Sequence, residues 1–271
     1  MNVNNSCSLP GSWSRPDVST GLTAGEVSVW KFVPADLIPY ARHFEELLSA
    51  HERQRLERYT DPSARREFLI CRGVLHLLLA FLSDADPVSV KIREEGNGKP
   101  QLEADGHKHP LEFNLAHTDG LCLIACSQEL EMGVDVERIQ PLPELEDMAR
   151  KYLAPLEMTQ WRAAALSQRA ELFCRFWSAK EALLKALGSG LRIPPAQVDT
   201  IEVLSGKSIN GKQDDGYYFE IGACVLEALP VADTCSAWLA VLGCPQKISL
   251  YEMTDQCLEG VIFSMGRKVE K

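Results

Sequence analysis

The segment that most constrains the fold is 173–187, because its apolar residues recur at helical spacing. At about 100° per residue they form one broad stripe, and Lys180 falls inside that stripe. An ammonium buried without a partner costs roughly several kcal/mol. Lys180 must therefore reach solvent, pair with a counter-charge or serve a ligand. Glu181 and Lys185 lie on the flank of the stripe, where an i, i+4 pair can also be an exposed helix pair.

A second segment, 130–139, alternates around two carboxylates. On a strand, Val134 and Val136 would face the core, and Asp135 and Glu137 would share the opposite face. Neighbouring carboxylates repel each other unless a cation lies between them. Oxygen ligands of this kind suit Mg²⁺, which keeps positions for water and substrate phosphates. The alternative is the solvated face of an edge strand.

Composition narrows the class of protein. The chain has 271 residues, 45% hydrophobic and 24% charged, which is typical of a soluble globular protein. A net charge of -10 argues against nucleic-acid and anionic-membrane partners. Nine cysteines without paired CxxC spacing indicate buried thiols of a reduced compartment. With no membrane-length apolar run and no secretory pattern, we expect a cytoplasmic protein whose residues 1–25 form a flexible lead.

Periodicity and turn signals divide the rest of the chain into two lobes, 26–140 and 141–271, separated by a Pro-Leu-Pro break at 141–143. Each lobe is predicted to be α+β, a mostly antiparallel sheet packed with helices. The N-terminal lobe is predicted to contain strands 26–33, 88–93, 111–115, 121–127 and 132–137, helix 36–59, a helix starting at Pro62, and a turn at Asn97–Gly98. The C-terminal lobe is predicted to contain helices 143–152, 155–165 and 168–187, and strands 198–204, 217–227, 236–242 and 247–251.

Together these segments resemble a known family. Five blocks, in order, are similar to motifs of the 4′-phosphopantetheinyl transferases of the larger, surfactin-synthetase-activating (Sfp-like) type. The blocks are residues 66–72, 98–100, 113–120, 133–137 and 177–185. The resemblance extends from about residue 26 to about residue 251. It implies two similar lobes related by a pseudo-two-fold axis, with the active site between them, and a monomer.

The resemblance also implies an activity. Such enzymes move phosphopantetheine from coenzyme A to a serine of an apo acyl or peptidyl carrier protein, and release adenosine 3′,5′-bisphosphate. This is holo-[acyl-carrier-protein] synthase activity, and it serves fatty-acid, polyketide or peptide synthases. Mg²⁺, with Mn²⁺ as an alternative, would bridge the phosphate oxygens. Two other readings are a magnesium-dependent hydrolase of pyrophosphate esters and a non-catalytic carrier-binding module.

The family motifs assign roles to individual residues. The metal ligands implied are Asp135, Glu137 and Glu181, and the general base is Glu181, Glu137 or a metal-bound water. Lys185 and His117 match phosphate-contacting cations, and Lys180 is expected to reach the pyrophosphate.

Basic residues in 53–72 provide candidates for the 3′-phosphate of coenzyme A. Arg55, Arg66 and Arg72 match best by position, and arginine suits bidentate phosphate contacts. The alternative is a solvated helix face in which arginines alternate with glutamates. Lys99 resembles the family's adenine-side or phosphate-side lysine, or is an exposed hairpin lysine. Two departures from the family pattern concern this site, Ala116 in place of a serine and the carboxylate of Glu67.

Overall fold

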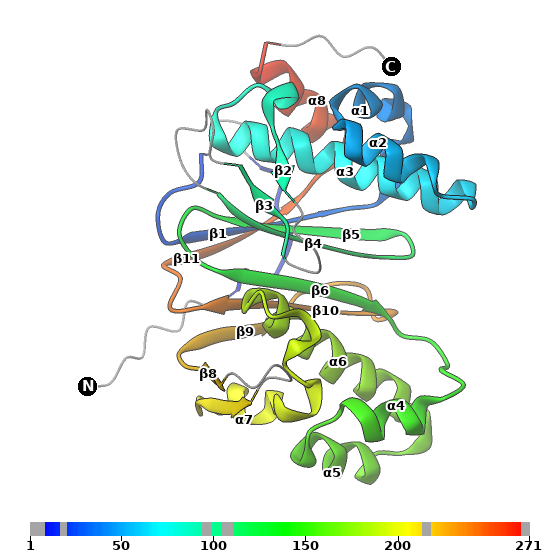
Figure 1. The fold of residues 1–271 in the computed structure, drawn as a ribbon, viewed down its shortest axis with the longest axis vertical. Coiled ribbons are helices and arrows are strands. Elements are labelled where there is room, and N and C mark those ends of the chain that lie inside the picture. The colour runs from blue at the N-terminus through cyan, green and yellow to red at the C-terminus, as the bar shows by residue number, and fades with distance from the viewer. Residues whose placement is uncertain (1–8, 17–20, 94–98, 104–110, 213–217, 267–271) are drawn as a thin grey trace.

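The computed structural model describes residues 9–16, 21–93, 99–103, 111–212 and 218–266. Two sheets pack face to face, and helices cover their outer faces (Figure 1). The α+β prediction is confirmed, whereas the pseudo-two-fold axis stays a prediction. The first sheet has the order β11 (Lys247–Glu252), β1 (Glu26–Phe32), β5 (Leu121–Ser127), β4 (Glu112–Thr118). The second has the order β6 (Met132–Arg138), β10 (Cys235–Leu242), β9 (Cys224–Ala228).

The remaining elements surround these sheets. Two small two-stranded sheets pair β2 (Ile92–Arg93) with β3 (Gln101–Leu102), and β7 (Ile209–Lys212) with β8 (Tyr218–Ile221). The first half of the chain and its C-terminal end supply η1 (Pro34–Tyr40), α1 (Ala41–Leu47), α2 (Ala50–Glu57), α3 (Pro62–Ser83), η2 (Pro87–Ser89) and α8 (Asp255–Ser264). The second half supplies α4 (Leu145–Tyr152), α5 (Pro155–Ala163), η3 (Leu166–Gln168), α6 (Arg169–Ala186), η4 (Gly190–Arg192), η5 (Pro195–Gln197) and α7 (Thr200–Leu204).

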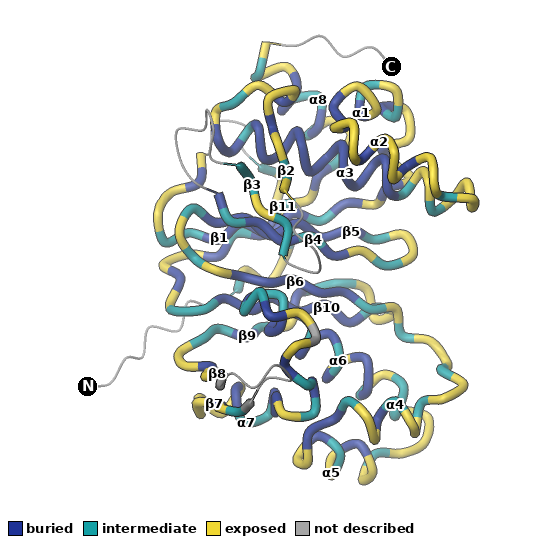
Figure 2. The backbone as a smooth tube through the Cα atoms, viewed as in Figure 1, coloured by how far each residue is buried: buried dark blue, intermediate teal, exposed yellow. Residues whose placement is uncertain are grey.

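Strand alternation produces the layered core. Val29 and Leu123 of the first sheet meet Val134 and Leu239 of the second in one buried cluster between the sheets. The opposite face of the first sheet packs against α3, and the opposite face of the second packs against α6. The buried backbone accordingly lies mainly in the strands, α3 and α6 (Figure 2). None of the described helices combines the length and apolar character that crossing a membrane requires.

Local capping decides where helices begin. Asp61 caps α3 by accepting from the Ala64 N–H at 2.9 Å, as the Asp-Pro start signal predicts. The single helix predicted over 36–59 is instead η1, α1 and α2, because Ser49 starts a new helix with a capping box to Glu52. The strand predicted over 198–204 is also wrong. Asp199 accepts from the N–H groups of the following residues and starts α7 there.

Two further predicted segments differ in extent. The strand predicted over 88–93 is reduced to β2, because Pro87 starts the short helix η2. Strand 217–227 is two strands, β8 and β9, in different sheets. Helices α4, α5 and α6 confirm the predicted helices to within a few residues. The turn predicted at Asn97–Gly98 lies outside the described residues.

The two main sheets exchange strands across the predicted division at residue 140, and the lobe boundaries themselves stay a prediction. Strand β6 precedes the 141–143 break but pairs with β10 of the second sheet, and β11 returns to pair in parallel with β1. Helix α8 follows β11 and packs its buried residues with the α3 side. Part of the predicted flexible lead is also ordered, because Ser14 bridges to Tyr251 and Trp13 donates to the Pro230 carbonyl at 2.5 Å. Parallel pairing needs a long crossover, which local periodicity does not reveal.

Candidate active site

The candidate site lies where the edges of the two sheets meet. Strands β4 and β6 are edge strands of different sheets, and the Val134 N–H donates to Asn114 Oδ1 at 2.9 Å across this seam. Lys99 closes one end of the seam, donating from Nζ to the Met132 carbonyl at 2.9 Å and lying 3.4 Å from Glu112. Asn114 and Lys99 thus form hydrogen bonds with backbone groups at the edge of β6 that are not paired with a neighbouring strand.

Alternation along β6 directs its two carboxylates toward α6. Val134 and Val136 enter the core between the sheets, so Asp135 and Glu137 face the other way. In the antiparallel register, Glu137 lies opposite Ser236 of β10, and Ser236 shares a 2.8 Å hydrogen bond with Ser178 of α6. The predicted shared face of the two carboxylates is confirmed, and it is covered by α6 rather than by bulk solvent.

Gly133 lets α6 approach β6 closely. A Cβ at this position would lie 2.1 Å from the Ala182 carbonyl oxygen and 2.5 Å from the Ala186 nitrogen, both backbone atoms. Only glycine fits this contact. The close approach places the side chains of Glu181 and Lys185 beside the carboxylates of β6.

Lys185 is paired with Asp135. Its Nζ lies 2.6 Å from Asp135 Oδ1 and 3.2 Å from the Val134 carbonyl oxygen. Asp135 is only 6% exposed, and its second oxygen, Oδ2, is buried without a hydrogen-bond partner among the described residues. Burial raises the pKa of Asp135, and the Lys185 charge opposes that rise. A buried carboxylate oxygen without a hydrogen-bond partner calls for a cation or a hydrogen-bond donor beside it.

Glu137 and Glu181 complete an acidic cluster. Trp177 of α6 donates from Nε1 to Glu137 Oε1 at 3.0 Å. Burial and the neighbouring Asp135 charge raise the pKa of Glu137 to about 6, and Glu181 contributes to that rise. Burial and Asp135 also raise the pKa of Glu181. The three carboxylates therefore interact electrostatically, and the prediction that they lie together is supported by this mutual effect.

The donor set fits a hard divalent cation. It offers carboxylate oxygens, one of them orphaned, in a cluster whose members destabilise one another's charge. As the side chains are placed in the described part of the chain, no three from His, Cys, Asp and Glu lie close enough together to bind one metal ion. Asp135, Glu137 and Glu181 would hold the ion, and this ion would supply charge neutralisation on phosphate oxygens when bound.

The residues of the first lobe that are predicted to contact phosphate lie on the first-sheet side of the seam, across from the acidic cluster of β6 and α6. His117, on β4, is exposed and lies 3.3 Å from Glu67 of α3, measured from Nδ1 to Oε1. Arg66 and Glu67 line a cavity of about 240 Å³, and Asp119 and Gly120 of the β4–β5 turn also line it. Arg55 is exposed on α2, with its guanidinium 5.1 Å from the ring centre of Phe68.

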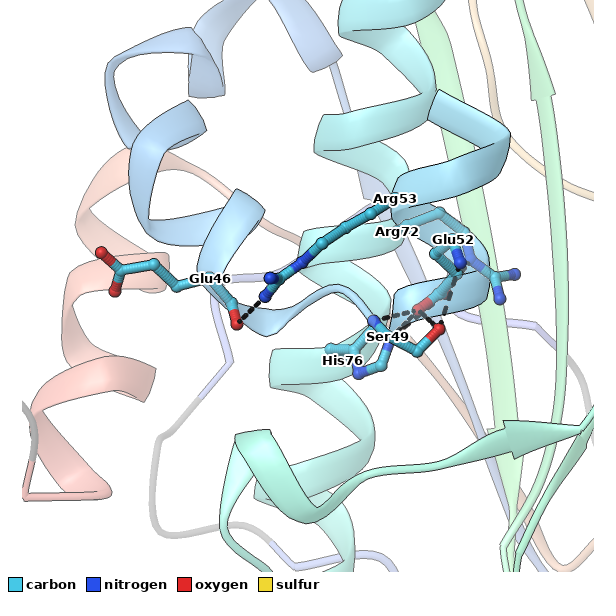
Figure 3. Close-up of polar contacts among 6 residues, drawn as sticks. All are labelled: Glu46, Ser49, Glu52, Arg53, Arg72 and His76. Carbon is cyan, nitrogen blue, oxygen red and sulfur yellow. Dashed lines mark hydrogen bonds and ion pairs between the residues drawn. The ribbon is translucent and has the colours of Figure 1, made fainter. Parts of the chain in front are cut away.

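Arg72 lies in a buried cluster rather than on the surface. It is 8% exposed, and its Nε donates to Glu52 Oε1 at 2.6 Å. His76 is fully buried, and its Nε2 lies 2.9 Å from the other carboxylate oxygen of Glu52 (Figure 3). Ser49 bonds the same carboxylate through its N–H and hydroxyl. This cluster joins α2 to α3, so the Nε edge of Arg72 is committed to the fold, and a phosphate contact from Arg72 stays a prediction.

The prediction that Lys180 reaches the pyrophosphate is wrong. Lys180 is fully buried, and its Nζ lies 2.7 Å from Glu157 Oε2 and also donates to the carbonyls of Pro195 and Val198. Burial lowers the pKa of Lys180, and the Glu157 charge opposes that effect. The other oxygen of Glu157 accepts from the Thr200 N–H and hydroxyl. Of the three readings the sequence allowed, pairing with a counter-charge is the correct one.

Sequence reasoning missed three residues that build the site. Gly133 interrupts an apolar strand, and an isolated glycine in a strand signals close backbone approach. Trp177 belongs to the recognised motif, but the periodicity placed it on the apolar stripe and did not reveal its bond to Glu137. Asn114 belongs to another motif, and only the meeting of β4 with β6 reveals its role.

Comparison with known proteins identifies the family. A family model described as the 4′-phosphopantetheinyl transferase superfamily matches residues 131–224, and a model of the N-terminal part of these transferases matches residues 37–129. The chain belongs to the 4′-phosphopantetheinyl transferase superfamily, as the motifs predicted. It is therefore an enzyme of phosphopantetheine transfer, and the carrier-binding-module reading is excluded.

Individual relatives agree with this assignment. The 4′-phosphopantetheinyl transferase HetI of Nostoc sp. is 30% identical over 235 residues, covering 87% of this chain and 95% of HetI. A putative 4′-phosphopantetheinyl transferase of Synechocystis sp., slr0495, is 31% identical over 214 residues, covering 79% of this chain and 86% of the relative. The transferase Sfp of Bacillus subtilis is 22% identical over 151 residues, covering 56% of this chain and 65% of Sfp.

Proposed function

We propose that this chain is a magnesium-dependent, Sfp-like transferase that moves phosphopantetheine from coenzyme A to a serine of an apo carrier protein. The acceptors are acyl or peptidyl carrier domains of fatty-acid, polyketide or peptide synthases, and the second product is adenosine 3′,5′-bisphosphate. The enzyme acts as a cytoplasmic monomer. The observation that carries the proposal is the cluster of Asp135, Glu137, Glu181 and Lys185 between β6 and α6, with an orphaned carboxylate oxygen.

The residues of this cluster divide the work. Asp135, Glu137 and Glu181 hold the divalent ion, and Mn²⁺ is the alternative to Mg²⁺. Lys185 contacts a phosphate oxygen of the pyrophosphate, exchanging part of its contact with Asp135 for the substrate. Glu181, Glu137 or a metal-bound water would remove the proton of the acceptor serine.

Coenzyme A lies along the seam between β4 and β6. His117 contacts a phosphate at the end of β4, on the first-sheet side of the seam. Arg66, which lines the 240 Å³ cavity, and Arg55 provide contacts for the 3′-phosphate. Lys99, which is bound to the β6 backbone, lies at the adenine or phosphate side. Arg72 supports this region through Glu52.

The direct test is incubation with coenzyme A, Mg²⁺ and a panel of apo carrier proteins, read by intact-protein mass. We expect a carrier to gain the mass of one phosphopantetheine unit while adenosine 3′,5′-bisphosphate appears in equal amount. The gain should disappear with a chelator and with Asp135→Ala. Cleavage of coenzyme A to free phosphopantetheine, with no gain by any carrier, would establish the hydrolase reading instead.

A further inference from the structure

One buried carboxylate fastens the short helix α2 to α3. Of the eight residues of α2, Glu52 and Leu56 are the buried ones. Leu56 joins the apolar cluster to which α3 contributes. Glu52 is only 4% exposed, and a buried carboxylate is tolerated where donors or opposite charges surround it. Because a helix of eight residues is not stable alone in water, the position of α2 depends on attachments of this kind.

Polar groups converge on both oxygens of the Glu52 carboxylate (Figure 3). Oε1 accepts from Arg72 Nε at 2.6 Å, and Oε2 lies 2.9 Å from His76 Nε2. Ser49, the N-cap of α2, donates to Oε2 from its N–H at 2.9 Å and from its hydroxyl at 2.8 Å. Arg72 and His76 are buried and lie four residues apart, on one face of α3. Contacts at both oxygens fix the plane of the carboxylate, so they hold the start of α2 in one orientation against α3.

The orientation of α2 decides where Arg55 lies. Arg55 follows Glu52 by three residues and is exposed. Its guanidinium lies 5.1 Å from the ring centre of Phe68 of α3. Phe68 comes two residues after Arg66, which lines the 240 Å³ cavity. Arg55 is thus placed over the same end of α3 as Arg66, and a rotation or shift of α2 against α3 would carry its guanidinium away from there.

We propose that Glu52 is a positioning residue, which anchors α2 to α3 and thereby holds Arg55 in place for the 3′-phosphate of coenzyme A. This inference rests on the proposed function, which assigns Arg55 to that phosphate. Arginine binds phosphate through a planar fork of N–H groups, so the contact depends on the orientation of the guanidinium. The consequence is selective. Loss of the anchor weakens coenzyme A and spares dephospho-coenzyme A, which has no 3′-phosphate for Arg55 to contact.

The test measures the Kd values of coenzyme A and dephospho-coenzyme A by calorimetry, without a carrier protein. Glu52→Gln keeps the shape of the side chain and removes the charge that pairs with Arg72. A charge-assisted contact changes affinity by about ten- to a hundredfold, and a displaced arginine should lose the lower part of that range. We expect the Kd of dephospho-coenzyme A divided by that of coenzyme A to fall about tenfold in Glu52→Gln, with the Kd of dephospho-coenzyme A unchanged. This ratio should fall at least as far in Arg55→Ala, and adding Glu52→Gln to Arg55→Ala should lower it no further.

Further variants separate positioning from a general loss of structure. Glu57→Gln removes an exposed glutamate of α2 and should leave the ratio unchanged. Ser49→Ala and His76→Gln each remove one contact of the anchor and should lower the ratio by less, so they carry the test if Glu52→Gln does not fold.

Two results would overturn the positioning role while Arg55→Ala still lowers the ratio. One is an unchanged ratio in the folded anchor variants, and the other is equal weakening of both cofactors. An unchanged ratio in Arg55→Ala would instead refute the assignment of Arg55 in the proposed function, and the positioning role with it. Because binding is measured without turnover, the result does not depend on whether the enzyme transfers phosphopantetheine.

Discussion

Replacing Gly133 by alanine should disturb the active site although every charged residue in it is kept. The added Cβ would lie 2.1 Å from the Ala182 carbonyl oxygen and 2.5 Å from the Ala186 nitrogen, whereas ordinary contacts begin at 3.4 Å. The added Cβ would therefore be 1.3 Å too close to the Ala182 carbonyl oxygen. Both obstacles are backbone atoms, so no side chain can rotate away. Either α6 or β6 must shift by about an ångström, and the contact of Lys185 with Asp135 must change with it.

The expected cost has two parts. Overpacking of this kind destabilises by about 1–3 kcal/mol, and the backbone clash places Gly133→Ala near the upper limit. For a chain of this size that corresponds to a Tm lower by about 6–12 °C, taking 2–4 °C per kcal/mol. Misplacing catalytic groups by about 1 Å lowers turnover by about a hundredfold. We therefore expect the folded variant to transfer phosphopantetheine about a hundred times more slowly.

The assay combines denaturant unfolding with the rate of carrier modification, measured well below the Tm of each variant. Gly222→Ala is the matched control, because a Cβ at that glycine meets no atom within 4 Å. It should keep both stability and rate. Wild-type stability and rate in Gly133→Ala would refute the argument that close approach of α6 to β6 positions Lys185 and Glu181.

Three further predictions concern single contacts. Lys180→Met should lose about 3–5 kcal/mol of unfolding free energy, because Glu157 stays buried without its partner; unchanged stability with weaker coenzyme A binding would instead restore Lys180 as a ligand residue. Burial tends to raise the pKa of Glu52, but His76 and Arg72 hold it far below its ordinary value of 4.5. The stabilisation from this lowered pKa is present above about pH 4.5 and is lost as the pH falls below that value. In urea unfolding below pH 4.5, wild type should therefore lose up to about 1.4 kcal/mol of unfolding free energy per pH unit relative to Glu52→Gln. The same pH dependence of stability in both proteins would contradict this. Trp177→Phe removes the donor to Glu137 and should raise the Mg²⁺ concentration for half-maximal rate about tenfold, and an unchanged Mg²⁺ dependence would mean that the bond does not orient Glu137.

Local pattern was enough to place the two central elements of the site. Helical spacing located α6, and alternation located β6 with Asp135 and Glu137 on one face. Both patterns reflect contacts within an element or with a single neighbouring layer, which local periodicity records. The family resemblance supplied the reaction, which periodicity alone could not have done.

Long-range contacts were the part that periodicity could not supply. Lys180 meets Glu157 on another helix, so its pairing depends on how α5 packs against α6. Strand β11 joins the first sheet by pairing with β1 more than 200 residues away. A polar residue can also override an apolar run, since Asp199 starts helix α7 where β-branched residues favoured a strand. Each of these outcomes is decided by tertiary partners, which local sequence does not identify.

The central claim is that the carboxylates between β6 and α6 hold the divalent ion on which transfer from coenzyme A depends. The most direct test is a crystal structure of the enzyme with coenzyme A and Mn²⁺, with the ion located by its anomalous scattering. We predict that the ion is bound by Asp135, Glu137 and Glu181, and that the pyrophosphate lies against it within reach of Lys185. An ion bound elsewhere, or a pyrophosphate that lies away from this cluster, would contradict the account.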